Sequence, residues 1–82
     1  MKYLLLGTSS CHLCELAEEL INECLATETG IKIELIDIAK QTQWQQDYAT
    51  LIPVLLHPKL LQSLNWPFTK ENILTFIEQN HD

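Results

Sequence analysis

The chain has 82 residues, 46% of them hydrophobic, which is enough for a single globular domain over residues 1–82 with one sheet and a few helices. Five lysines and no arginine stand against eleven acids, and the formal net charge of −6 argues against a nucleic-acid partner, because phosphate backbones attract clustered basic residues. No apolar run approaches the roughly 20 residues of a membrane span, so we expect no membrane association.

The first predicted elements are a buried strand and a helix. Residues 2–7 form a nearly continuous apolar run, which is typical of a central strand buried on both faces of a sheet. The polar turn Thr8-Ser9-Ser10 follows, and its hydroxyls can cap the next helix. That helix is predicted from Cys11 onward, because apolar residues recur at helical spacing with glutamates opposite them. The apolar stripe comprises Leu13, Leu16, Ala17, Leu20, Ile21, Cys24 and Leu25.

Two cysteines, Cys11 and Cys14, stand at the start of this helix. At that spacing they lie on one face with their Cβ atoms roughly 5 to 6 Å apart, which is close to the separation that a disulfide requires. The helix start also presents free backbone N–H groups and the positive end of the helix dipole, which stabilise a thiolate, whereas the nearby glutamates oppose one. Cys11 is therefore the candidate nucleophile and Cys14 the candidate resolving thiol.

The three cysteines fit a reducing compartment better than a secreted disulfide framework. We therefore expect a cytoplasmic protein. Cys24 falls on the apolar stripe and is predicted to be a buried, inert thiol. A metal site at Cys11 and Cys14 would need two further ligands, and the sequence offers neither a second Cys-x-x-Cys nor a His-x-x-x-His, so we expect no metal.

A second strand and a second helix follow the first helix. Apolar residues alternate with charged ones from residue 31, and the run Ile36-Asp37-Ile38 follows, which predicts a strand. The long helical crossover predicts that this strand pairs in parallel with the first. Residues 39–50 are polar and rich in glutamine, and they predict a short helix with Trp44 and Tyr48 on one side.

The last third of the chain predicts a hairpin and a final helix. Residues 52–57 and 59–63 are predicted strands, with Pro58 suited to the turn between them. Thr69 is the expected N-cap of the final helix, and Phe68 before it can pack onto the first turn. The predicted buried face of this helix consists of Ile73, Leu74 and Ile77. Two of the three histidines, His57 and His81, are predicted surface residues.

This order of elements, βαβ followed by ββα, predicts an α/β thioredoxin-like fold with a four-stranded mixed sheet and helices on both faces. Three stretches carry a closer resemblance: Gly7-Thr8-Ser9-Ser10-Cys11-His12-Leu13-Cys14, Tyr48-Ala49-Thr50-Leu51-Ile52-Pro53-Val54-Leu55 and Trp66-Pro67-Phe68. They resemble the small bacterial glutaredoxin-like proteins of the thioredoxin superfamily, over almost the whole chain. The resemblance implies a thiol-disulfide oxidoreductase in which Cys11 attacks, Cys14 resolves, and Pro53 is a cis-proline facing the active site.

The resemblance also indicates where a substrate would bind. Composition alone favours an ordinary trans proline at a strand start, whereas the resemblance favours a cis bond at Pro53. Ile52 would then offer its N–H and C=O to an incoming peptide, as an added strand does. Ser10 and His12 complete the expected substrate-binding residues. A protonated His12 could stabilise the thiolate, or the side chain could simply be solvated.

The sequence lacks three features that are typical of glutathione-binding glutaredoxins. No basic residue precedes Cys11, Leu51 stands in place of a threonine, and residues 62–66 contain no glycine pair. We therefore expect no bound cofactor, and glutathione or a reductase as the reductant. The expected substrate is a disulfide-containing protein or a small-molecule thiol, and the expected state is a monomer.

A different class of function is also open. A thioredoxin-like domain can hold a partner protein without turnover. Trp44 and Tyr48 would then form an exposed aromatic patch, whereas packing of both rings against the core is the competing expectation.

Overall fold

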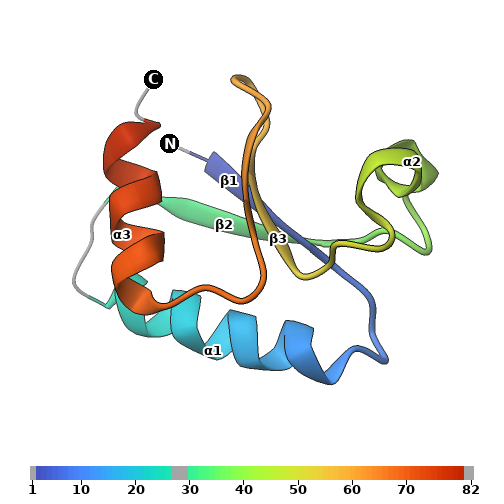
Figure 1. The fold of residues 1–82 in the computed structure, drawn as a ribbon, viewed down its shortest axis with the longest axis horizontal. Coiled ribbons are helices and arrows are strands. Elements are labelled where there is room, and N and C mark those ends of the chain that lie inside the picture. Colours follow the sequence, from blue (N-terminus) through green and yellow to red (C-terminus); the bar gives the residue numbers. More distant parts are fainter. Residues whose placement is uncertain (1, 27–29, 81–82) are drawn as a thin grey trace.

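A mixed β-sheet forms the centre of the molecule in a computed structural model that describes residues 2–26 and 30–80 (Figure 1). Among these residues the strands are β1 Lys2–Gly7, β2 Lys32–Asp37, β3 Val54–His57 and β4 Gln62–Asn65. They lie in the order β2-β1-β3-β4. β1 pairs in parallel with β2 and antiparallel with β3, which pairs antiparallel with β4. The predicted four-stranded mixed sheet, with the first strand in its interior, is confirmed.

Helices cover both faces of this sheet. α1 His12–Leu25 and α3 Lys70–Gln79 pack on one face. The short elements η1 Thr42–Trp44 and α2 Gln45–Tyr48 lie on the opposite face (Figure 1). Because side chains alternate along a strand, the apolar run of β1 supplies both layers. Tyr3 and Leu5 pack with α1 and α3, whereas Leu4 and Leu6 pack toward Trp44 and Tyr48. The thioredoxin-like α/β fold is therefore present as predicted.

Trp44 and Tyr48 pack against the core. Both side chains are half-buried against the cluster that contains Leu4 and Leu6, and their ring centroids lie 6.2 Å apart. This confirms the packing expectation. None of the helices in the described part of the chain is long and apolar enough to cross a membrane.

α1 buries a narrower stripe than its sequence pattern predicts. Cys14, Ala17, Ile21 and Cys24 are buried, which confirms the prediction for Cys24. Leu13 and Leu16 are instead 44% and 36% exposed. The first turn of α1 already lies level with Gly7, the last residue of β1, so the sheet covers only one side of that turn. Part of the predicted apolar stripe therefore faces solvent.

The hairpin differs from the prediction at its turn. Residues 58–61 form the connection, and β4 begins at Gln62 rather than at residue 59. Leu61 has a φ of 55° and its N–H donates to the carbonyl of His57 at 2.8 Å. The two leucines before Gln62 resemble a strand in sequence, but the backbone closes a turn there.

The prediction of a surface position for His57 is wrong. The side chain is 1% exposed, its Nδ1 accepts a hydrogen bond from the N–H of Leu60 at 3.2 Å, and its ring meets the ring of Tyr3 edge-on with centroids 5.2 Å apart. The pairing register places this residue on the same face as Leu55, under α3. His81 lies outside the described residues.

α3 begins where the sequence predicts. The hydroxyl of Thr69 accepts a hydrogen bond from the N–H of Asn72 at 3.1 Å, and the Asn72 amide oxygen accepts one from the Thr69 N–H at 3.0 Å. Phe68 and Ile73 lie in the same buried cluster. The predicted buried face is wrong at Leu74, which is 38% exposed. Phe76 is buried instead, because the spacing i, i+3, i+4 from Ile73 defines the stripe that faces the sheet.

Replacing Thr69 by alanine is expected to destabilise the fold by about 1 kcal/mol, within a range of about 0.5 to 2, because the hydrogen bond that the Thr69 hydroxyl accepts from the N–H of Asn72 is lost. Urea denaturation followed by far-ultraviolet circular dichroism measures the change. Thr75→Ala, at an exposed position inside the same helix, is the matched control and should change stability by only a few tenths of a kcal/mol. Equal midpoints for the two variants would contradict the prediction.

Candidate functional site

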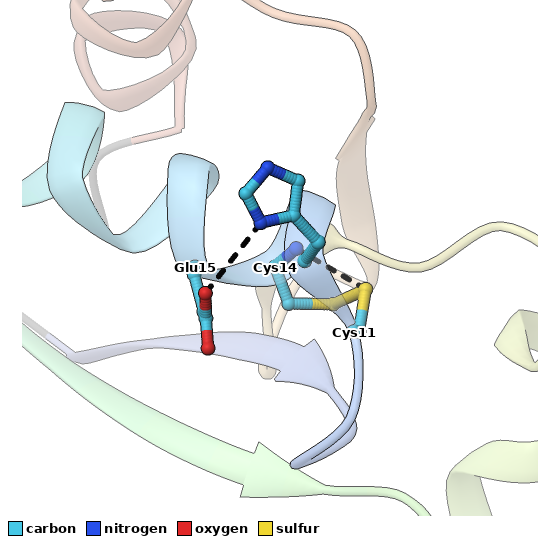
Figure 2. Close-up of a disulfide and its surroundings, with 4 residues drawn as sticks. Cys11, Cys14 and Glu15 are labelled. Atoms are coloured by element: carbon cyan, nitrogen blue, oxygen red, sulfur yellow. Dashed lines mark hydrogen bonds and ion pairs between the residues drawn. A yellow bond between two sulfur atoms is a disulfide. The ribbon is translucent and has the colours of Figure 1, made fainter.

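Cys11 and Cys14 form a disulfide at the start of α1 (Figure 2). Their Cα atoms are 5.2 Å apart, which is within the range that a disulfide bridges without backbone movement. The two sulfurs differ in environment. Cys11 is partly exposed at the mouth of the helix, whereas Cys14 is only 8% exposed. Of the two predicted redox residues, Cys11 is therefore the one that an incoming molecule can reach.

The cap of α1 is the Cys11 side chain. Its Sγ accepts a hydrogen bond from the backbone N–H of Cys14 at 3.1 Å, so the predicted cap by a hydroxyl of Thr8, Ser9 or Ser10 is wrong. Thr8 contributes its carbonyl, which accepts a hydrogen bond from the Cys11 N–H at 3.3 Å, and Ser10 is exposed beside it. A thiolate at Cys11 would accept the same N–H at the positive end of the helix dipole.

Gly7 lets Cys14 pack against the end of β1. A Cβ on Gly7 would lie 2.8 Å from the Cys14 Sγ, which is too close for a non-bonded contact, and 3.1 Å from the Cys14 Cβ, which is a tight contact. Only glycine admits this approach. Sequence reasoning treated Gly7 as the end of an apolar strand and missed this contact. A glycine that ends a buried strand shortly before the cysteine pair is the signal that could have indicated it.

Pro53 lies at the same end of the sheet as Gly7. The Ile52–Pro53 peptide bond is cis, as the resemblance implies. The pairing of β1 with β3 ends at Leu6 and Val54, so Pro53 follows at the level of Gly7. The Pro53 carbonyl accepts a hydrogen bond from the Trp66 N–H at 3.2 Å, which fixes this corner to the start of the β4–α3 connection. The Trp66–Pro67 bond is also cis, which the sequence did not indicate.

The other predicted site residues occupy different surroundings. Ile52 is half-buried and packs against the cluster that contains Val54. His12 is exposed, and its Nδ1 lies 3.6 Å from a carboxylate oxygen of Glu15 (Figure 2). The imidazole therefore lies mainly in solvent, beside the carboxylate of Glu15. The structure brings Cys11 and Cys14 into bonding contact and places Ser10 and His12 in the chain beside them.

A pocket of about 320 Å³ opens behind Cys14, on the side of β2. Its walls include the carboxylates of Glu15, Glu18 and Asp37 together with Cys14 and Leu35. This acidic lining repels anions. Glutathione carries two carboxylates against one ammonium group, so the pocket is poorly suited to it. Within residues 2–26 and 30–80, no group of three or more His, Cys, Asp or Glu side chains is arranged to hold a metal ion.

Comparison with models of known protein families assigns the chain to a family. The model of the glutaredoxin-like domain family (DUF836) matches residues 2–78. The chain belongs to this family. No curated protein matches the sequence of this glutaredoxin-like domain.

Solved structures support the same fold. The X-ray structure of XcR50, a Northeast Structural Genomics target protein from X. campestris, superimposes with a TM-score of 0.77 at 23% sequence identity, over 96% of this chain and 99% of that one. The solution structure of XcR50 gives a TM-score of 0.75 at 23% identity, over 99% and 97% of the two chains. At this identity the similarity establishes the fold of the glutaredoxin-like domain and leaves its activity to the chemistry of the site.

Proposed function

We propose that this glutaredoxin-like domain is a thiol-disulfide oxidoreductase that works by dithiol exchange. The observation that carries the proposal is the bonded pair Cys11 and Cys14 at a helix N-terminus, with the first sulfur accessible and the second buried behind it. The accessible sulfur can meet a substrate, and the buried one meets only its neighbour. That asymmetry divides the roles of attacking and resolving thiol.

The reaction proceeds in two exchanges. The Cys11 thiolate attacks one sulfur of a substrate disulfide, so that a mixed disulfide forms and the other substrate sulfur leaves as a thiolate. The Cys14 thiolate then attacks the Cys11 sulfur, closes the internal disulfide and releases the second substrate thiolate. Two electrons and, after protonation, two protons pass from the dithiol to the substrate. Glutathione or a reductase restores the dithiol at the cost of its own oxidation.

Local electrostatics act on the Cys11 thiolate in both directions. The N–H of Cys14 and the helix N-terminus stabilise negative charge on the Cys11 sulfur, whereas the carboxylates of Glu15 and Glu18 oppose it. The backbone at Ile52 and Pro53 would hold an extended substrate strand, with Ser10 and His12 at the rim. We infer that the domain acts as a monomer on protein disulfides in the cytoplasm, where reducing thiols can regenerate it.

A turnover assay tests the proposal. Wild-type protein should catalyse the reduction of a protein disulfide by dithiothreitol, and a small mixed disulfide with glutathione should be turned over more slowly, because the acidic surroundings of Cys14 disfavour glutathione. Many substrate disulfides reduced per molecule of protein would support an enzyme. Stoichiometric binding of the substrate protein without turnover would overturn the proposal in favour of a binding module.

A further inference from the structure

A second surface lies along α1, beyond the turn that carries the two cysteines. A groove of about 570 Å³ lies between α1 and the connection from β4 to α3, and Figure 1 shows this connection, in orange, running alongside α1. We call this groove the α1 groove. Its lining residues are Leu16, Glu19, Leu20, Asn22, Glu23 and Trp66. The mechanism proposed above uses none of them.

Exposed leucines on one side of α1 lead from the candidate active site to the α1 groove. Leu13 lies between the two cysteines, and at about 100° per residue it shares one side of α1 with Leu16 and Leu20, within a sector of roughly 60°. Leu13 and Leu16 are 44% and 36% exposed. On the opposite wall, the backbone N–H of Trp66 donates a hydrogen bond to the carbonyl of Pro53. The groove therefore joins the helix that carries Cys11 to the corner that carries the cis-proline.

The rim of the α1 groove is acidic. Glu19 and Glu23 are exposed there, and α1 contains no lysine or arginine from His12 to Leu25. Lys70 at the start of α3 lies 3.4 Å from the carboxylate of Glu23, so this lysine is engaged with the rim itself. The whole chain carries a net charge of −6. A ligand that covers these leucines should accordingly be apolar with positive charge at its edges.

We propose that the α1 groove docks the polypeptide that flanks the disulfide of a substrate protein, with an apolar side chain over Leu16 and Leu20 and a lysine or arginine beside Glu19. This inference rests on the proposed function and names its substrate class. From Cys11, Leu16 and Leu20 lie roughly 7.5 and 13.5 Å along the helix axis at 1.5 Å per residue. An extended chain spans about 3.3 Å per residue, so the docked residues are two to four positions from the substrate cysteine.

Three substrates test the proposal, and two of them are peptides of matched length. The first is a disulfide peptide with leucine and lysine two to four positions from its cysteine, the second replaces lysine by glutamate, and the third is a small disulfide without flanking residues. For wild type, kcat/KM should be about tenfold higher for the lysine peptide than for the glutamate peptide, and this ratio should shrink at high salt because exposed charges are screened.

Paired variants locate the effect. Glu19→Lys should lower the ratio of kcat/KM for the lysine peptide to kcat/KM for the glutamate peptide about three- to tenfold, because the substitution reverses the charge at the rim. Leu16→Gln should raise KM for both peptides about fivefold, because apolar contact is lost. The matched controls lie on α3, away from the groove: Glu78→Lys makes the same charge change and Leu74→Gln removes an equally exposed leucine. Both should keep the wild-type ratio and KM.

The outcomes separate this proposal from the one on which it rests. Turnover of the small disulfide together with equal kcat/KM for the two peptides would overturn docking and leave the proposed function standing. Absence of turnover with all three substrates would overturn both. A concentration-dependent dimer that Leu16→Gln dissociates would assign the groove to a second copy of the chain and overturn the substrate assignment.

Discussion

Replacing Cys11 by serine is expected to abolish catalysed reduction of protein disulfides, with kcat/KM falling by about a thousandfold or more to the rate of the reductant alone. A serine hydroxyl does not ionise near neutral pH, and its oxygen cannot take the place of sulfur in a mixed disulfide. The partly exposed Cys11 is the sulfur that a substrate can reach, and the buried Cys14 cannot substitute for it. The measurement is the rate at which dithiothreitol reduces the disulfides of insulin, with wild type and variant at equal concentrations of folded protein.

The companion variant Cys14→Ser distinguishes the two sulfurs. The first attack by Cys11 should remain, but the mixed disulfide should persist because the resolving thiol is missing. Mass spectrometry of the unreduced protein would detect one substrate chain bound to Cys11. Turnover that survives in the glutathione assay alone would indicate that glutathione resolves the adduct in place of Cys14.

Cys24 provides the internal control for both variants. It is buried on the α1 stripe, with its Sγ 3.7 Å from the carbonyl of Lys70. Cys24→Ala should therefore keep turnover while losing some packing energy. Full activity of Cys11→Ser, or loss of activity in Cys24→Ala without loss of fold, would contradict the assignment of roles.

The parts of this fold that the sequence predicts are those that local patterns determine. The apolar run of β1, the buried part of the α1 stripe (Ala17, Ile21 and Cys24) and the cap at Thr69 each follow from residues close together in the chain. The Cys11–Cys14 disulfide belongs to the same class, because the spacing alone brings the two sulfurs within reach. The cis bond at Pro53 came from the family resemblance, since composition favours trans.

The features that sequence reasoning missed depend on contacts between distant segments. His57 is the last residue of a strand and precedes a proline, which suggests a surface turn, yet the pairing of β3 places its ring against Tyr3. Leu61 extends an apolar run but adopts a positive φ that closes the hairpin. In the sequence, Gly7 is an ordinary strand end. In the structure, α1 packs so closely against it that Cys14 occupies the space that a side chain at position 7 would need. Local propensity cannot specify such choices, because tertiary packing decides them.

Gly7→Ala is the variant with the largest expected effect on the candidate site apart from the cysteines themselves. The added Cβ would meet the Cys14 Sγ at 2.8 Å, and relieving such overpacking typically costs about 1 to 3 kcal/mol. In the disulfide form the Cys14 sulfur is tied to Cys11 and cannot turn away. In the dithiol form the side chain can change rotamer, so we expect the penalty to be larger for the oxidised protein.

The expected result is a shift of the redox equilibrium of Gly7→Ala toward the dithiol. If most of the cost is confined to the oxidised form, the reduction potential rises by roughly 20 to 65 mV, because about 30 mV corresponds to 1.4 kcal/mol for two electrons. Equilibration in glutathione redox buffers, followed by alkylation of free thiols and mass analysis, measures the oxidised fraction.

Gly30→Ala is the matched control, because Gly30 has a φ of 81° and a Cβ there would meet no atom within 4 Å. Alanine in this left-handed conformation should cost about 1 to 2 kcal/mol of folding stability without touching the cysteine pair. The two variants should therefore lose comparable stability, while only Gly7→Ala changes the potential. An unchanged potential in Gly7→Ala with reduced stability would mean that α1 as a whole moves to make room, so that Gly7 supports the fold without favouring the closed disulfide.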